Sequence, residues 1–205
     1  MKLQNKEDQP QVILMFPVPV WVTSFKDDYS SEFEWMKKLD WGMTDQTSVN
    51  NYVLDDPILA DLRSFIELSI TKYTSEIFRY EQEFFITQSW VNKKSKGVAH
   101  HEHRHPNSIV SGVWYPHISK DTSPILFSNL HEKNIVVEPV EYNDFNADSY
   151  KLLVNSGSLI LFPSYVKHSV PPNQCDEDRM SLSFNTWTKG SLGDKNSLNY
   201  IAETR

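Results

Sequence analysis

Apolar residues in the first half of the chain recur at helical spacing. Between residues 57 and 80 they are separated by three or four positions, which is the repeat of an amphipathic helix. Asp56 can cap this helix, and Pro57 suits its first turn. A shorter helix is predicted over about 31–41, where Ser31 begins a capping-box pattern. The sequence therefore predicts two helices before the middle of the chain.

From residue 84 onward the pattern changes to that of strands. Short apolar or alternating runs are separated by turn residues, which is typical of a β-sandwich or barrel. The run 12–22 is also strand-like, but its two prolines favour a sheet edge. The predicted strands of the second half are 84–92, 109–115, 125–130, 134–137, 150–154, 158–162, 167–170 and 180–187.

Length, charge and cysteine content narrow the class of protein. A chain of 205 residues suits one domain, here with helical support at about 25–80 and a β core at about 84–188. The net charge is −7 without a basic stripe, so nucleic acid is not an expected partner. The single Cys175 cannot form an internal disulfide. Neither a signal peptide nor a membrane span is recognisable, so a cytoplasmic protein without a membrane partner is expected.

Histidines are concentrated in one short segment. Four of the seven lie between residues 100 and 105, and such a cluster in a β-structure is a candidate metal site. Residues two apart on a strand point the same way, so His101 with His103, or His103 with His105, can face one ion. His168 follows a strand and a proline corner and could supply a third ligand. Three protein ligands leave positions open for substrate and oxygen.

A possible anion site follows the last of these histidines. Arg179 comes eleven residues after His168 and is followed closely by Ser181. A guanidinium group matches a carboxylate with two parallel hydrogen bonds, so an inward arginine beside a hydroxyl is suited to hold one.

Together these residues resemble a known family. Residues 103–108, His-Arg-His-Pro-Asn-Ser, followed by Ser-Gly-Val-Trp-Tyr at 111–115, are similar to the signature of the 2-oxoglutarate–Fe(II) oxygenases of bacteria and phages. Further stretches that resemble the family are 16–20, 90–92, 157–164 and 179–185, together with His168.

The resemblance implies a double-stranded β-helix, a jelly-roll of the cupin-like kind with helices at its N-terminal side. It implies Fe(II) held by His103 and His168, with His105 where the wider superfamily usually has Asp or Glu. It further implies that Arg179 and Ser181 bind the distal carboxylate of the cosubstrate 2-oxoglutarate, and that O₂ is used to hydroxylate a substrate.

Several alternatives stay open. His100 and Glu102 could be the metal ligands, although the surrounding motif favours His103 and His105. Tyr115 and Asn92 could reach the cosubstrate or could serve packing and strand pairing. A three-histidine cupin-like enzyme without 2-oxoglutarate, or a binding module without activity, would share the barrel. The substrate could be a small molecule or a protein side chain, and the edge near residue 17 could be covered by a second copy in a homodimer.

Overall fold

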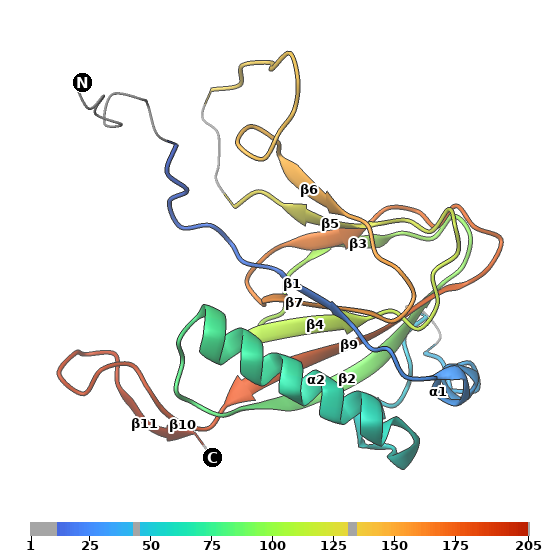
Figure 1. Cartoon of the computed structure of the whole chain (residues 1–205), viewed down its shortest axis with the longest axis horizontal. Coiled ribbons are helices and arrows are strands. Elements are labelled where there is room, and N and C mark those ends of the chain that lie inside the picture. The colour runs from blue at the N-terminus through green and yellow to red at the C-terminus, as the bar shows by residue number, and fades with distance from the viewer. Residues whose placement is uncertain (1–11, 43–45, 131–134, 205) are drawn as a thin grey trace, which may run out of the picture.

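Two antiparallel β-sheets face each other and form the body of the protein (Figure 1). A computed structural model describes residues 12–42, 46–130 and 135–204. The five-stranded sheet has the order β1 (Trp21–Ser24), β7 (Ser158–Pro163), β4 (Val110–Trp114), β9 (Arg179–Thr188) and β2 (Phe84–Lys94). The four-stranded sheet has the order β3 (His100–His103), β8 (His168–Val170), β5 (Ile125–Ser128) and β6 (Ser149–Leu152). A separate hairpin joins β10 (Gly190–Leu192) and β11 (Ile201–Thr204).

Helices lie against the outer face of the five-stranded sheet (Figure 1). The helix predicted over 57–80 is confirmed as a continuous series of helical turns, and the Asp56 carboxylate accepts a hydrogen bond from the Ile58 amide. The capping box predicted at Ser31 is wrong, because the shorter helix begins one residue earlier and the Ser31 hydroxyl donates to Glu32 instead. The helical elements are α1 (Ser30–Met36), η2 (Val53–Asp55), η3 (Pro57–Leu59), α2 (Ala60–Lys72) and η4 (Tyr73–Ile77).

The two faces of the large sheet serve different cores. Phe184 and Leu161 face the helices, whereas Phe162 and Tyr115 face the smaller sheet. Gly112 sits where the first of these cores is tightest: a Cβ atom there would lie 2.2 Å from the Phe184 ring and 2.8 Å from Leu161. The alternation along β9 therefore turns Arg179 and every second residue after it toward the opposite sheet.

Most of the predicted strands are present, with three local differences. The first strand covers only Trp21–Ser24, because the proline-containing part of the run does not pair, yet it lies at a sheet edge as predicted. No strand forms at 135–137, where the apolar side chains are exposed, and residue 134 of that prediction lies outside the described residues. The hairpin of β10 and β11 was not predicted.

Candidate metal centre

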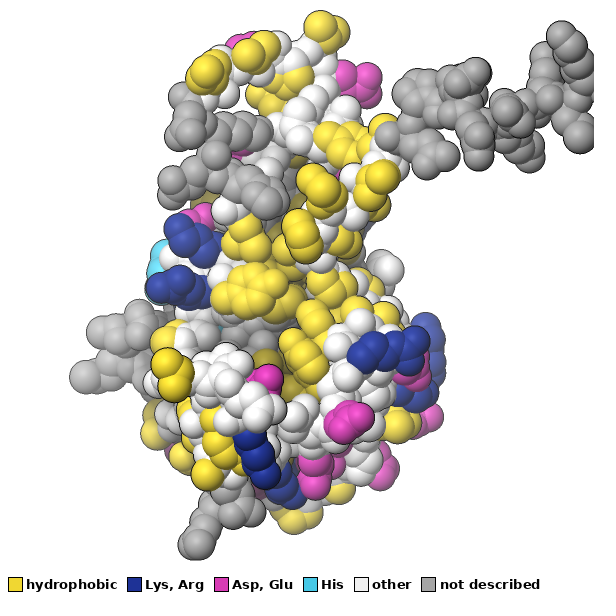
Figure 2. Space-filling model, turned by 90° about the vertical axis from the view of Figure 1, so that its left-hand side faces the viewer, with side chains coloured by type: hydrophobic (Ala, Val, Ile, Leu, Met, Phe, Trp, Pro, Cys, Tyr) yellow, Lys and Arg dark blue, Asp and Glu magenta, His cyan; other side chains and the backbone are white. Residues whose placement is uncertain are grey.

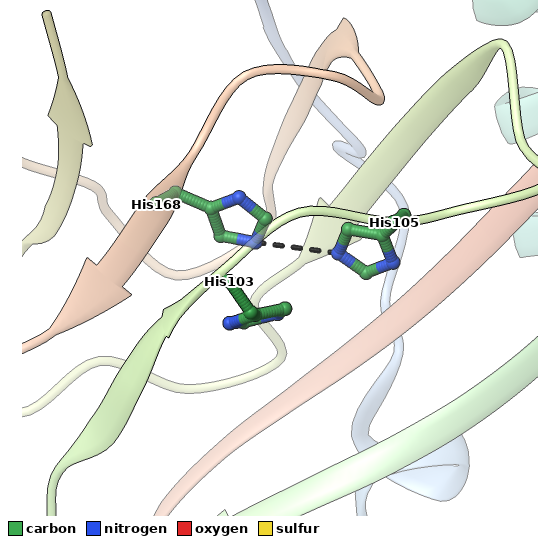
Figure 3. Close-up of side chains that lie close together, drawn as sticks. All are labelled: His103, His105 and His168. Atoms are coloured by element: carbon green, nitrogen blue, oxygen red, sulfur yellow. Dashed lines mark hydrogen bonds between the residues drawn. The ribbon is translucent and has the colours of Figure 1, made fainter.

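Three histidines converge between the two sheets (Figure 3). His103 is the last residue of β3, and its register partner is His168, the first residue of β8. His105 lies two positions after His103 in the sequence. One ring nitrogen of each lies within 4.8 Å of the others, and the Nε2 atoms of His105 and His168 are 3.3 Å apart. These distances allow one ion to contact all three side chains. The pairing of β3 with β8 thus places His103 opposite His168, and His105, which lies 63 positions before His168, reaches the same point.

The local environment keeps these imidazoles neutral, which is the form that binds metal. Burial and the neighbouring His103 lower the pKa of His168 to about 3 and that of His105 to about 4. Burial also lowers the pKa of His103. The Nδ1 atoms of His103 and His168 lie 2.9 Å and 3.1 Å from the carbonyl oxygens of His101 and Val166. If Nδ1 donates to these carbonyls, Nε2 carries the lone pair that a metal requires.

The rival carboxylate lies elsewhere. Glu102 accepts a hydrogen bond from the Ser128 hydroxyl and lies 3.6 Å from Lys167 Nζ on the exposed side of the small sheet. These contacts lower the Glu102 pKa. His100, its suggested companion, stacks on His103 with ring centroids 4.5 Å apart. The structure therefore brings together His103, His105 and His168, and it does not bring Glu102 to them.

A buried arginine faces the same interior. Arg179, the first residue of β9, is only 5% exposed, and its Nε and Nη2 atoms have no hydrogen-bond partner within the described part of the chain. A buried cation with unpaired N–H groups is costly unless a ligand satisfies it. The sequence predicted that this arginine binds a carboxylate, and that role stays a prediction.

The other predicted cosubstrate residues surround this arginine in different ways. The Arg179 guanidinium lies 5.1 Å from the centre of the Tyr115 ring, and burial raises the Tyr115 pKa despite this positive charge. Ser181 is buried on β9, and its register partner on β2 is Asn92. The Asn92 amide already donates to Ser183 Oγ at 3.0 Å. Tyr115 thus lies beside Arg179, whereas Asn92 ties the two strands together.

Two further polar residues of this interior were not among the predicted site residues. Lys94 is 8% exposed and is the register partner of Arg179. The sequence did contain a signal for this, because Lys94 lies two positions after Asn92 and residues two apart on a strand face the same side. Asn185 hydrogen-bonds His105 and also accepts from Ser111 Oγ at 2.9 Å. It therefore helps to orient one of the three imidazoles.

Comparison with known proteins agrees with this architecture. Residues 88–185 match the model of the family described as "Putative 2OG-Fe(II) oxygenase". No curated protein sequence matches the chain. HygX from Streptomyces hygroscopicus, solved with nickel and 2-oxoglutarate, superposes with a TM-score of 0.58 at 12% identity, covering 82% of this chain and 81% of that one.

Two more solved structures share the fold. A 2OG-Fe(II) oxygenase family oxidoreductase from Burkholderia pseudomallei has a TM-score of 0.54 at 14% identity and covers 76% of each chain. A prolyl-4-hydroxylase from Pseudomonas putida has a TM-score of 0.52 at 13% identity, covering 82% of this chain and 84% of that one. The predicted fold, a mainly β double-stranded β-helix with N-terminal helices, is confirmed.

The interior of this fold therefore holds a cluster of neutral histidines and a buried arginine whose Nε and Nη2 atoms have no hydrogen-bond partner among the described residues. The match of residues 88–185 to this family model supports an oxidoreductase of the 2OG-Fe(II) oxygenase type, which uses Fe(II), 2-oxoglutarate and O₂. Within the described residues, none of the helices has the length and apolar character needed to cross a membrane.

Proposed function

We propose that this oxygenase is a hydroxylase, with Fe(II) held by His103, His105 and His168. When bound, the ion and 2-oxoglutarate supply the activation of O₂ that oxidises a substrate C–H bond. The three imidazoles are neutral and close together, which supports their assignment as ligands. A set of three histidines leaves the full charge of the ion in place, unlike a set that contains a carboxylate.

Arg179 is the proposed anchor of 2-oxoglutarate, and its two unpaired buried donors are the observation that carries the proposal. It would bind the distal carboxylate through Nε and Nη2, with Ser181 beside it on the same face of β9. Tyr115 closes one side of this position and excludes water, since its ring is fully buried. Asn92 holds the neighbouring strand in register through Ser183.

Anaerobic titration of the Fe(II)-loaded protein with 2-oxoglutarate tests the cosubstrate assignment. We expect a visible charge-transfer band that saturates, and succinate production when O₂ is admitted. The matched sample contains Zn(II), which has no redox chemistry and should remain colourless. A protein that binds Fe(II) but gives neither band nor succinate would contradict the proposal.

Hydroxylation is tested separately. Candidate substrates are screened for those that accelerate 2-oxoglutarate consumption, and the products are analysed by mass spectrometry after reaction under isotopically labelled O₂. A hydroxylase inserts one labelled oxygen atom into the product. A product that has lost hydrogen or changed its stereochemistry without gaining oxygen would instead assign a different oxidation to the same site.

A further inference from the structure

A cleft of about 520 Å³ adjoins the histidine cluster. His105 lines it and is also one of the three proposed metal ligands, so the cleft and the candidate metal centre share a wall. The cleft lies at the end of the large sheet where β4 begins and β7 ends, because Val110 and Pro163 are register partners there and both line it. Arg179 lies at the opposite end of the interior, six residues before Asn185, which contacts His105. A ligand in the cleft would therefore not occupy the position proposed for 2-oxoglutarate.

Three aromatic side chains, Phe78, Tyr80 and Tyr165, line this cleft. Tyr80 and Tyr165 line it although they are 43% and 55% exposed, and Phe78 stacks on Tyr80 with centroids 5.3 Å apart and planes inclined by 11°. Figure 2 views the molecule from the left-hand side of Figure 1, the side on which β9 ends. On this face, hydrophobic side chains gather across the middle, and Lys or Arg side chains lie beside them. Open aromatic surface of this kind binds flat apolar groups by stacking and burial.

One cation stands among these apolar walls. Arg104 is the single Lys, Arg, Asp or Glu that lines the cleft, and it is exposed. Within residues 12–42, 46–130 and 135–204 its guanidinium forms no ion pair or hydrogen bond. In a protein with a net charge of −7 such a group is available to an anion from outside.

We propose that this cleft binds the substrate of the oxygenase, and that the substrate combines a flat ring with an anionic group such as a carboxylate. Arg104 would bind the anion, Tyr80 and Tyr165 would contact the ring, and the shared wall at His105 would bring the molecule beside the metal centre. Arg104 is then a specificity-determining residue, distinct from the proposed cosubstrate anchor at Arg179. This inference rests on the proposed function of the histidine cluster.

Nuclear magnetic resonance with 2-naphthoate as the probe tests the inference without relying on turnover. The protein is loaded with paramagnetic Mn(II) and saturating 2-oxoglutarate, so that the cosubstrate position is filled, and probe relaxation is compared with that of a Zn(II)-loaded sample. We expect 2-naphthoate to bind and to relax faster with Mn(II). Its neutral analogue 2-naphthylmethanol should bind about tenfold more weakly, as expected for loss of one exposed charge-assisted hydrogen bond.

Variants distinguish the charge from the fold. Arg104→Ala should weaken 2-naphthoate binding about tenfold, Arg104→Lys should retain part of the affinity, and Tyr165→Ala should weaken the acid and the alcohol alike. Lys167→Ala removes the same charge from a neighbouring exposed position, which does not line the cleft, and should leave binding unchanged. The relaxation of 2-oxoglutarate itself is recorded in every sample. The inference about the cleft is wrong if 2-oxoglutarate binds but 2-naphthoate does not. It is also wrong if Arg104→Ala binds 2-naphthoate as tightly as the wild type. If 2-oxoglutarate also fails to bind, the proposed function fails with it.

Discussion

Replacing Arg179 by methionine should separate cosubstrate binding from folding. Methionine has a similar length and fills a buried position without a charge. Arg179 is a buried cation whose Nε and Nη2 atoms find no partner in the part of the chain that the structure describes, and its register partner Lys94 is also a buried cation. Replacing such an uncompensated charge with an apolar side chain is neutral or stabilising in other proteins. We therefore expect the free energy of unfolding of the ligand-free variant to stay level or rise.

The loss of 2-oxoglutarate affinity can be estimated from the same two donors. A hydrogen bond to a charged group contributes about 1.5–3 kcal/mol, and two bonds to one carboxylate are not fully additive. A total of about 3 kcal/mol corresponds to an increase in Kd of roughly 10²-fold. Arg179→Lys keeps the charge but offers no planar fork, so it should recover only part of this affinity.

Anaerobic titration of Fe(II)-loaded protein, followed by its visible band, gives the Kd, and thermal unfolding of the ligand-free protein gives the stability. Arg79→Met serves as the control, because it removes an exposed arginine that does not line the interior. An unchanged Kd in Arg179→Met would refute the assignment of the anchor. A large fall in the unfolding temperature of the ligand-free variant would refute the argument that the guanidinium is uncompensated.

Three further predictions concern the ligands, pH and packing. Glu102→Gln should leave the Fe(II) affinity unchanged, whereas His105→Ala should lower it by more than about 10²-fold, because loss of a residue that only contacts a metal ligand already costs roughly 10–100-fold. Competition with a chelator measures both affinities. A larger loss in Glu102→Gln than in His105→Ala would favour the carboxylate as the ligand. The metal-free protein should lose stability as the pH falls from about 6.5 toward 4, because the pKa values of His105 and His168 are about 4 and about 3 in the folded state and the unfolded chain takes up protons first. Thermal unfolding of the wild type and of His168→Gln across this pH range measures the effect. A His168→Gln variant whose stability depends on pH as steeply as that of the wild type would contradict the prediction. Gly112→Ala should destabilise the fold by about 1–3 kcal/mol, because its methyl group would overlap the Phe184 ring; denaturant unfolding at unchanged slope measures it, and wild-type stability would show that the contact relaxes.

Local signals in the sequence located the elements well where they involve near neighbours. The helix from Pro57 and its Asp56 cap follow from spacing and from one side-chain hydrogen bond, both of which are local. The same reasoning failed at Ser31, where the helix begins one residue earlier and the serine turns to Glu32. It also failed at 135–137, because apolar β-branched residues form a strand only when another strand pairs with them.

The candidate site depended more strongly on long-range contacts. Period two allowed His101 with His103 as readily as His103 with His105, and only the pairing of β3 with β8 places His103 opposite His168. Glu102 was the less favoured alternative in the sequence, and its strand turns it toward Ser128 and Lys167. The period of two along the strand places Lys94 on the same face as Asn92, but only the pairing of β2 with β9 buries it opposite Arg179.

The sequence alone determined the order of helices and strands, the family resemblance and the residue types able to bind a metal and a carboxylate, because these depend on composition and on neighbours along the chain. The tertiary structure decided which side chains meet, which donors have no partner among the described residues, and that a cleft lined by the exposed Arg104 lies beside His105. These properties come from strand register and from the packing of residues that are far apart in the sequence. A shift of one residue in the register of a strand would turn the same side chains to the opposite face of the sheet.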